Sequence, residues 1–208
     1  MPGVTAPVPS TIVPSTGPVA PTLLDTLMPR FDHRTIRGRP VNAPLEAVAA
    51  AIRETPLNDA LLARGLLAVR TLGRSLRRPA APIADLGDGE TGFVRVGESA
   101  SEVVLGFAGR PWPRGGSSLQ LDAQGWRDLD PRDCVKVAFS LRCTTAVYGT
   151  LLITETRIVC GPQARKSFDR YWLVIRPGSD LVRGSLLRAI AKRAELRTRS
   201  EPGRITSQ

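Results

Sequence analysis

The sequence has few of the side chains that bind metals or act as nucleophiles. It contains one histidine, His33, and three cysteines, Cys134, Cys143 and Cys160, with no CxxC pair. A zinc site built from cysteine and histidine would therefore have too few ligands. His33 also has no evident serine, cysteine or aspartate partner, which argues against a catalytic triad. We expect reduced, half-buried thiols on strands, and neither a metal nor a cofactor.

Long apolar runs are also missing. No stretch approaches the roughly 20 apolar residues that a membrane-spanning helix needs. The first basic residue is Arg30, so the charged start of a secretory signal is absent. These observations predict a cytoplasmic protein of 208 residues, which is long enough for one domain of ordinary size.

Acidic residues are scarce relative to basic ones: 19 Asp and Glu stand against 29 Lys and Arg, for a net charge of +10. Such an excess suggests an acidic partner, either nucleic acid or an anionic membrane. The basic residues are spread along the chain, however, apart from modest clusters at Arg74–Arg78 and Arg188–Arg199, and no known nucleic-acid motif is present. A solvated basic surface is therefore favoured, and a surface that binds nucleic acid or anionic membrane remains an alternative.

Composition divides the chain into three parts. Residues 1–22 repeat proline among Thr, Ser and Val without charge or aromatic rings, which predicts a disordered tail. Residues 197–208 form a polar, basic tail that we expect to be flexible. One domain, 23–196, lies between them.

The first half of this domain predicts a strand and two helices. Residues 33–42 form the strand candidate, and 43–54 follow as a helix whose first turn suits Pro44. Residues 57–73 repeat leucines at a 3.6-residue period and end at a glycine, which is typical of a second helix. We expect 74–90 to be a loop.

The pattern then changes to the alternation of strands. Residues 91–99, 101–112 and, more briefly, 117–121 are strand candidates, and 122–130 form a helical turn or a lid-like loop. Residues 133–144 alternate with Val135, Val137, Phe139 and Leu141 on one face, and 149–160 return antiparallel after a turn at 146–149. Folding this pair brings Cys134 roughly opposite Cys160.

A long amphipathic helix follows, opened by Gly161 and Pro162. Pro177 lies in its middle, where proline removes a helical hydrogen bond at a cost of about 3 kcal/mol. We therefore expect a break at 176–179 that bends the helix over a curved sheet. Both halves should then face one core, through Tyr171, Trp172, Ile175, Leu181, Val182 and Leu186. This order of elements predicts an α+β fold, with the helix covering one face of an antiparallel sheet.

Three segments resemble the START-like or SRPBCC superfamily. They are "VNAPLEAVAAAI", then "GFAGRPW" with "AFSLRC" and "LLITETRIV", and finally "SFDRYWLVIRPGSDLVRGSLLRAI". The resemblance covers about residues 30–195 and implies the helix-grip fold, in which a curved sheet wraps around the C-terminal helix and encloses a cavity for apolar or amphipathic molecules. Members range from carriers to polyketide cyclases, so the resemblance alone does not establish catalysis.

Several side chains are candidates for binding a ligand. Glu155 and Arg157 share a strand face with Leu151 and Ile153, where they form either an exposed ion pair or the polar floor of the cavity. The tryptophans and Tyr171 suit a pocket wall or plain core. The candidate ligand-binding residues are Trp112, Trp126, Phe139, Glu155, Arg157, Tyr171 and Trp172.

Three functions follow from these observations. The first is binding of a hydrophobic or amphipathic small molecule, such as a lipid or a polyketide-like compound, between the sheet and the C-terminal helix. The second is a polyketide cyclase or aromatase, with Glu155, Arg157 or Tyr171 moving or orienting a proton. The third is the basic surface binder.

Overall fold

The computed structural model describes residues 21–55, 92–112 and 116–200. The helices in this part are α1 (Leu23–Leu27), α2 (Leu45–Glu54), α4 (Ala123–Asp128) and α5 (Arg165–Ser200). The strands are β1 (His33–Val41), β2 (Phe93–Glu98), β3 (Glu102–Arg110), β4 (Ser117–Ser118), β5 (Val135–Thr145) and β6 (Thr150–Cys160). The predicted helix at 57–73, the loop at 74–90 and most of both predicted tails lie outside the described residues.

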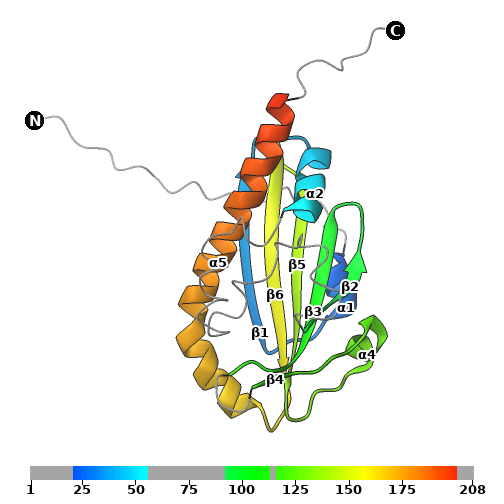
Figure 1. The fold of residues 1–208 in the computed structure, drawn as a ribbon, viewed down its shortest axis with the longest axis vertical. Helices are drawn as coiled ribbons and strands as arrows, with labels where there is room; N and C mark the ends of the chain where they lie inside the picture. The colour runs from blue at the N-terminus through cyan, green and yellow to red at the C-terminus, as the bar shows by residue number, and fades with distance from the viewer. Residues whose placement is uncertain (1–20, 56–91, 113–115, 201–208) are drawn as a thin grey trace, which may run out of the picture.

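The strands form one antiparallel sheet in the order β1-β6-β5-β3-β2, with the short β4 paired to β3. α5 runs along the sheet against β1 and β6, and α2 lies beside its C-terminal half and packs on β5 (Figure 1). A curved antiparallel sheet with a long C-terminal helix on one face is the helix-grip arrangement, so the predicted α+β fold class is confirmed.

Alternation along the strands gives the sheet two covered faces. We call the face toward α2 and α5 the inner face, and the face toward α1 and α4 the outer face. Val135, Val137, Phe139 and Leu141 lie together on the inner face, as predicted. The turn after β5 closes where the Ala146 amide donates to the Gly149 carbonyl. Cys160 pairs with Val135, one residue from the expected Cys134.

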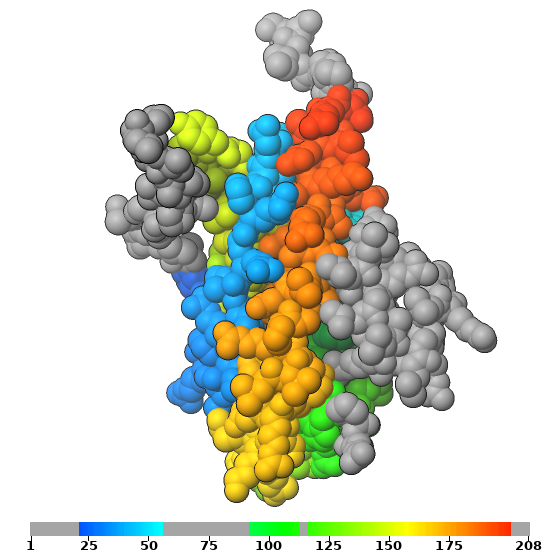
Figure 2. Space-filling view, turned by 90° about the vertical axis from the view of Figure 1, so that its left-hand side faces the viewer, coloured from blue at the N-terminus to red at the C-terminus, as the bar shows by residue number. Residues whose placement is uncertain are grey.

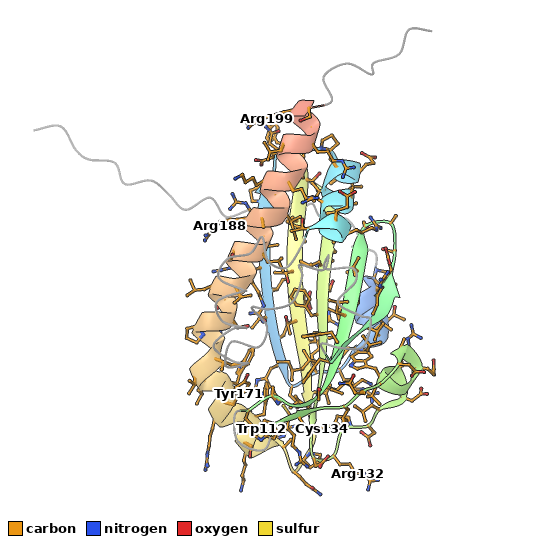
Figure 3. The ribbon with its side chains drawn as sticks, viewed as in Figure 1. Trp112, Arg132, Cys134, Tyr171, Arg188 and Arg199 are labelled. Atoms are coloured by element: carbon orange, nitrogen blue, oxygen red, sulfur yellow. The ribbon has the colours of Figure 1, made fainter. Side chains whose placement is uncertain are left out.

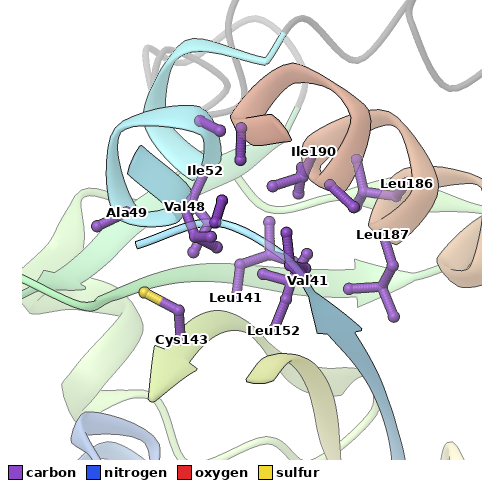
Figure 4. Close-up of a cluster of buried hydrophobic side chains, with 14 of the residues drawn as sticks. Val41, Val48, Ala49, Ile52, Leu141, Cys143, Leu152, Leu186, Leu187 and Ile190 are labelled. Atoms are coloured by element: carbon purple, nitrogen blue, oxygen red, sulfur yellow. The ribbon is translucent and has the colours of Figure 1, made fainter. Parts of the chain in front are cut away.

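The larger core lies between the inner face and the two helices α2 and α5. Leu141 and Leu152 from the sheet contact Val48 and Ile52 of α2, and Ile190 of α5 closes the cluster (Figure 4). All five side chains are buried. Burial of each such side chain contributes about 1.5–3 kcal/mol, which fixes the C-terminal half of α5 on the sheet.

The outer face has a second core, which the sequence analysis did not predict. Trp126 of α4 is fully buried against Val96, Val104 and Ala138, and its Nε1 donates 3.2 Å to the Phe107 carbonyl. Gly106 makes room for this ring, since a Cβ there would lie 2.7 Å from it. Leu24 and Met28, in and after α1, cover the remainder of this core.

α5 is one continuous helix through Pro177, so the predicted break at 176–179 is wrong. The helix instead follows a curved path along the sheet (Figure 1). Pro177 and Leu173, four residues before it, are both on the exposed side, where water can satisfy the carbonyl that proline leaves without a donor.

The limits of α5 also differ from the prediction. Gly161 and Pro162 form a turn, and the helix begins at Arg165. It ends at Ser200, four residues into the segment expected to be a flexible tail. Leu186 faces the inner core as expected, whereas Leu181 is 56% exposed and does not. None of the helices in the described part of the chain has an apolar stretch long enough to cross a membrane.

Candidate functional site

Strand pairing sets the inner-face side chains in rows across the sheet. One row reads Phe93, Phe107, Val137, Ile158 and His33 from β2 to β1. The next row toward α2 reads Arg95, Leu105, Phe139, Thr156 and Thr35. The third reads Val103, Leu141, Thr154 and Arg37. The inner face is therefore apolar over β3 and β5, β2 adds Phe93 and Arg95, and β6 and β1 carry hydroxyl groups.

Three phenylalanines form the apolar part. The rings of Phe93 and Phe107 lie 5.6 Å apart, and Phe139 lies one row further along the sheet. All three are half-buried, whereas Leu105 and Leu141 between and beyond them are buried. The phenylalanines thus retain apolar surface on the face that α2 and α5 cover.

Aromatic side chains also gather where α5 begins. Tyr171, Trp172 and Trp112 pack against a cluster that includes Phe168, and Figure 3 shows Trp112 and Tyr171 at this end of the sheet. The His33 ring contacts Phe168 at 5.4 Å between centroids. Its Nε2 lies 3.1 Å from Oδ1 of Asp169, so His33 has the carboxylate partner that the sequence did not reveal.

The polar part of the inner face is built around Arg183, a buried residue of α5. Its Nη1 lies 3.0 Å from Oδ1 of Asp180, and its Nη2 donates 3.2 Å to Oγ1 of Thr156. Arg37 reaches the same turn of α5 and donates to the Asp180 carbonyl at 2.7 Å. Burial lowers the pKa of Arg183, against the effect of Asp180 and in the same direction as the charge of Arg37.

Two hydroxyl groups on this face have no partner among the described residues. Oγ1 of Thr35 and Oγ1 of Thr154 are buried without a hydrogen bond to any residue that the structure describes. Thr35 pairs directly with Thr156, and Thr154 lies two residues before Thr156 on the same face of β6. A buried hydroxyl without a partner costs about 1–3 kcal/mol, and the inner face holds two such groups to which the described residues supply no partner.

Glu155 and Arg157 do not face α5, so the expectation that they line a cavity beside it is wrong. Both are buried on the outer face, where Arg157 donates to Glu155 at 2.8 Å and to the Met28 carbonyl at 2.9 Å. The expectation of an exposed ion pair is wrong as well, because α1 covers the pair. Burial alone would raise the pKa of Glu155, but hydrogen bonds from Arg34 and Arg157 outweigh it and lower the pKa.

The seven predicted site residues therefore separate into two groups. Trp112, Phe139, Tyr171 and Trp172 lie on the inner side, as expected. Trp126, Glu155 and Arg157 lie on the outer side, because α1 and α4 give the sheet a second covered face. The sequence analysis predicted correctly which residues of a strand share a face. It did not predict which of these faces is covered by α5 and which by α1 and α4.

Sequence reasoning missed Arg183 and the three threonines. The segment Thr154-Glu155-Thr156-Arg157 held the signal, since its threonines must face away from its charged residues. That signal becomes useful once the covered faces are known. Arg183 carried no distinguishing mark among the other arginines of α5.

The thiols are buried and free. Burial raises the pKa of Cys143 to about 11 and that of Cys160 to about 12, and it also raises the pKa of Cys134. Such thiols remain protonated and are poor nucleophiles near neutral pH. Within the described ranges, no group of three or more His, Cys, Asp or Glu side chains is placed to hold a metal ion.

No protein-family model matches the chain, and no curated protein matches it. Solved structures similar to it include the di-domain ARO/CYC StfQ from the steffimycin biosynthetic pathway, at 13% identity and a TM-score of 0.42 over 79% of this chain and 52% of that one. Protein MLL2253 from Mesorhizobium loti has 13% identity and a TM-score of 0.37, over 77% and 98% of the two chains. The Zhui aromatase/cyclase from Streptomyces sp. R1128 has 14% identity and a TM-score of 0.34, over 82% and 98%. The chain spans about half the length of the di-domain protein.

Proposed function

We propose that this protein binds an amphipathic small molecule between the inner face of the sheet and α5. The observation that carries the proposal is the set of half-buried phenylalanines, Phe93, Phe107 and Phe139, on a face that two helices otherwise cover. Ligand sites in proteins are concave, mostly apolar and supplied with a few polar groups. Phenylalanines on β2, β3 and β5, with hydroxyls on β6 and β1, have that composition.

Binding is favoured over the cyclase or aromatase alternative because of where the predicted acid–base groups lie. Glu155 is held as a carboxylate by two guanidinium groups on the outer face, and Arg157 is held beside it. Neither is placed to reach a molecule on the inner face. Tyr171 and the His33–Asp169 pair remain on the inner side, so the enzyme alternative would depend on these three residues.

Intrinsic fluorescence offers a direct test. Trp112 and Trp172 lie at the inner side, and Trp126 lies on the outer face. Titration with 1-anilinonaphthalene-8-sulfonate and then with dodecanoate should change the tryptophan emission and displace the dye, and native mass spectrometry should show one bound molecule. Phe139→Ala removes an inner-face ring and should weaken binding about tenfold. Tyr148→Ala is the matched control, because Tyr148 is 89% exposed at the β5–β6 turn.

Two results would contradict the proposal. The first is that neither probe binds the full-length chain at micromolar concentrations. The second is that Phe139→Ala binds as tightly as the Tyr148→Ala control and the original protein, while its melting temperature shows that it is folded.

A second candidate function, docking on an anionic membrane surface, is supported by the outward side of α5. Leu173 and Val174 are 76% and 79% exposed, and Leu181 is 56% exposed. Exposed basic residues flank them along the same helix: Lys166, Arg170, Arg176, Arg188 and Lys192. Figure 2 shows α5 along the full length of this side of the molecule. Apolar side chains flanked by cations suit anionic lipids.

Vesicle sedimentation distinguishes this function from ligand binding. Vesicles with about one third phosphatidylglycerol should retain the protein at low salt and release it as salt screens the charges, whereas pure phosphatidylcholine vesicles should not retain it. Val174→Ser should reduce retention without changing dodecanoate binding. Equal retention on both vesicle types, or none on either, would exclude this candidate.

A further inference from the structure

The polar part of the inner face combines a buried cation with two hydroxyl groups that have no hydrogen-bond partner among the described residues. Arg183 is 5% exposed and has five N–H donors. Among the described residues, Asp180 accepts a hydrogen bond from its Nη1 and Thr156 accepts one from its Nη2. Thr154 is fully buried, and neither its hydroxyl nor that of Thr35 is bonded within the described part of the chain.

The charges around this point do not cancel. Arg183 and Arg37 bring two positive charges to the turn of α5 that begins at Asp180, and Asp180 brings one negative charge. The Asp180 side chain is 45% exposed, so water screens its attraction for Arg183. Arg188 lies close as well, since its Nη2 and Nη1 of Arg37 both approach Gly184. Arg188 itself is exposed to solvent and labelled in Figure 3.

We propose that Arg183, with the hydroxyls of Thr35, Thr154 and Thr156, binds a carboxylate group at one end of the ligand. A carboxylate accepts from a guanidinium and from hydroxyls at once, and it would supply acceptors that the described residues do not supply to Arg183, Thr35 and Thr154. Of the three arginines at this point, Arg183 is the buried one, and its single positive charge matches a monoanion. A dianion such as a phosphate monoester would bring a second negative charge without a partner. The assignment rests on the proposed function, because the apolar part of the same molecule would lie against Phe139 and its neighbours.

The experiment compares dodecanoate with methyl dodecanoate, which has the same chain and no charge. Isothermal titration calorimetry on the full-length chain should give about tenfold tighter binding of dodecanoate, the preference that a hydrogen bond to a charged group supplies. Arg183→Met should abolish this preference by weakening dodecanoate and leaving the ester unchanged. Arg176→Met, an exposed arginine of the same helix, is the matched control and should keep it.

Arg183→Met also removes the hydrogen bond from Arg183 to Thr156, which could destabilise the fold. Thr154→Val is a second variant that leaves this hydrogen bond in place. It should also reduce the preference for dodecanoate, about threefold or more. Dodecyl phosphate should bind no more tightly than dodecanoate. Equal affinity for dodecanoate and its ester in the original protein would overturn the carboxylate site while leaving the proposed function intact. Failure of both probes to bind would instead count against the proposed function itself.

Discussion

Nε of Arg157 donates a 2.8 Å hydrogen bond to Oε1 of Glu155, two residues earlier on β6, and both side chains are buried. Nε of Arg34 on β1 donates to the same oxygen at 2.7 Å. At the other side, Nη2 of Arg157 donates 2.5 Å to Asp25 of α1. This chain of charges fastens α1 and β1 to β6, so the outer face gives Glu155 a structural role.

Glu155→Gln should therefore destabilise the protein. Glutamine retains the shape but removes the buried negative charge that Arg34 and Arg157 share, which leaves Asp25 as the carboxylate bonded to Arg157, and the loss of a hydrogen bond to a charged group costs about 1.5–3 kcal/mol. Urea denaturation followed by circular dichroism measures the loss in the free energy of unfolding. Glu46→Gln, an exposed position in the first turn of α2, is the control and should change it by less than about 1 kcal/mol. A loss below 1 kcal/mol at Glu155 would contradict the structural role.

Acid should weaken the attachment of α1. The amide of Thr22 and then the guanidinium of Arg157 hydrogen-bond the Asp25 carboxylate and lower its pKa from the ordinary 3.8 to about 2. Because the folded-state pKa is the lower one, Asp25 stabilises the fold fully above pH 3.8 and loses this effect as the pH falls toward 2. Asp25→Asn should make the decline in stability between these pH values shallower, as measured by urea denaturation at each pH. An unchanged decline would contradict the assignment.

The positions of α1 and α4 explain why the sequence predicted the sheet better than the site. Alternation along β5 and β6 depends on the 2-residue period of a strand and was read correctly. Whether a given set of alternate residues faces α5 or the opposite side depends on which helices cover each face of the sheet. The sequence analysis expected helices on one face of the sheet only. Under that expectation, any buried Glu155, Arg157 or Trp126 would have to lie beside α5.

One local signal for the second covered face was present. Thr22 and Asp25 have the spacing of a capping box, and in the structure the Thr22 side chain accepts from the Asp25 amide while the Asp25 carboxylate accepts from the Thr22 amide. This signal predicts that a helix begins within the segment next to the proline-rich tail. It does not predict where the helix packs, because the contact with Arg157 joins residues 132 positions apart.

Pro177→Ala should stabilise the protein. The alanine amide can donate to the carbonyl of Leu173, and the clash of the proline ring with the preceding turn disappears, so a gain of about 1–3 kcal/mol in the free energy of unfolding is expected. Both positions lie on the exposed side of α5, and the substitution removes no buried contact. Arg176→Ala is the neighbouring control. A loss of stability in Pro177→Ala would show that the curvature of α5 depends on the proline and that the packing on the sheet depends on the curvature.

Thr154→Val should separate stability from binding. Valine keeps the branched shape that suits a strand and removes a buried hydroxyl that has no partner among the described residues. The free energy of unfolding of the ligand-free protein should therefore rise by about 1 kcal/mol. Affinity for dodecanoate should fall in the same variant, because the hydroxyl is one of the groups proposed to bind its carboxylate.

The opposite signs of these two effects distinguish a binding residue from a packing residue. A threonine that only packs would lose stability or change little on substitution by valine, and binding would follow stability. Thr144→Val, on the exposed end of β5, should alter neither quantity appreciably and serves as the control. If Thr154→Val instead lowers the free energy of unfolding, the hydroxyl has a partner in the free protein, such as a bound water. Thr154 would then be part of the fold and not a group kept available for a ligand.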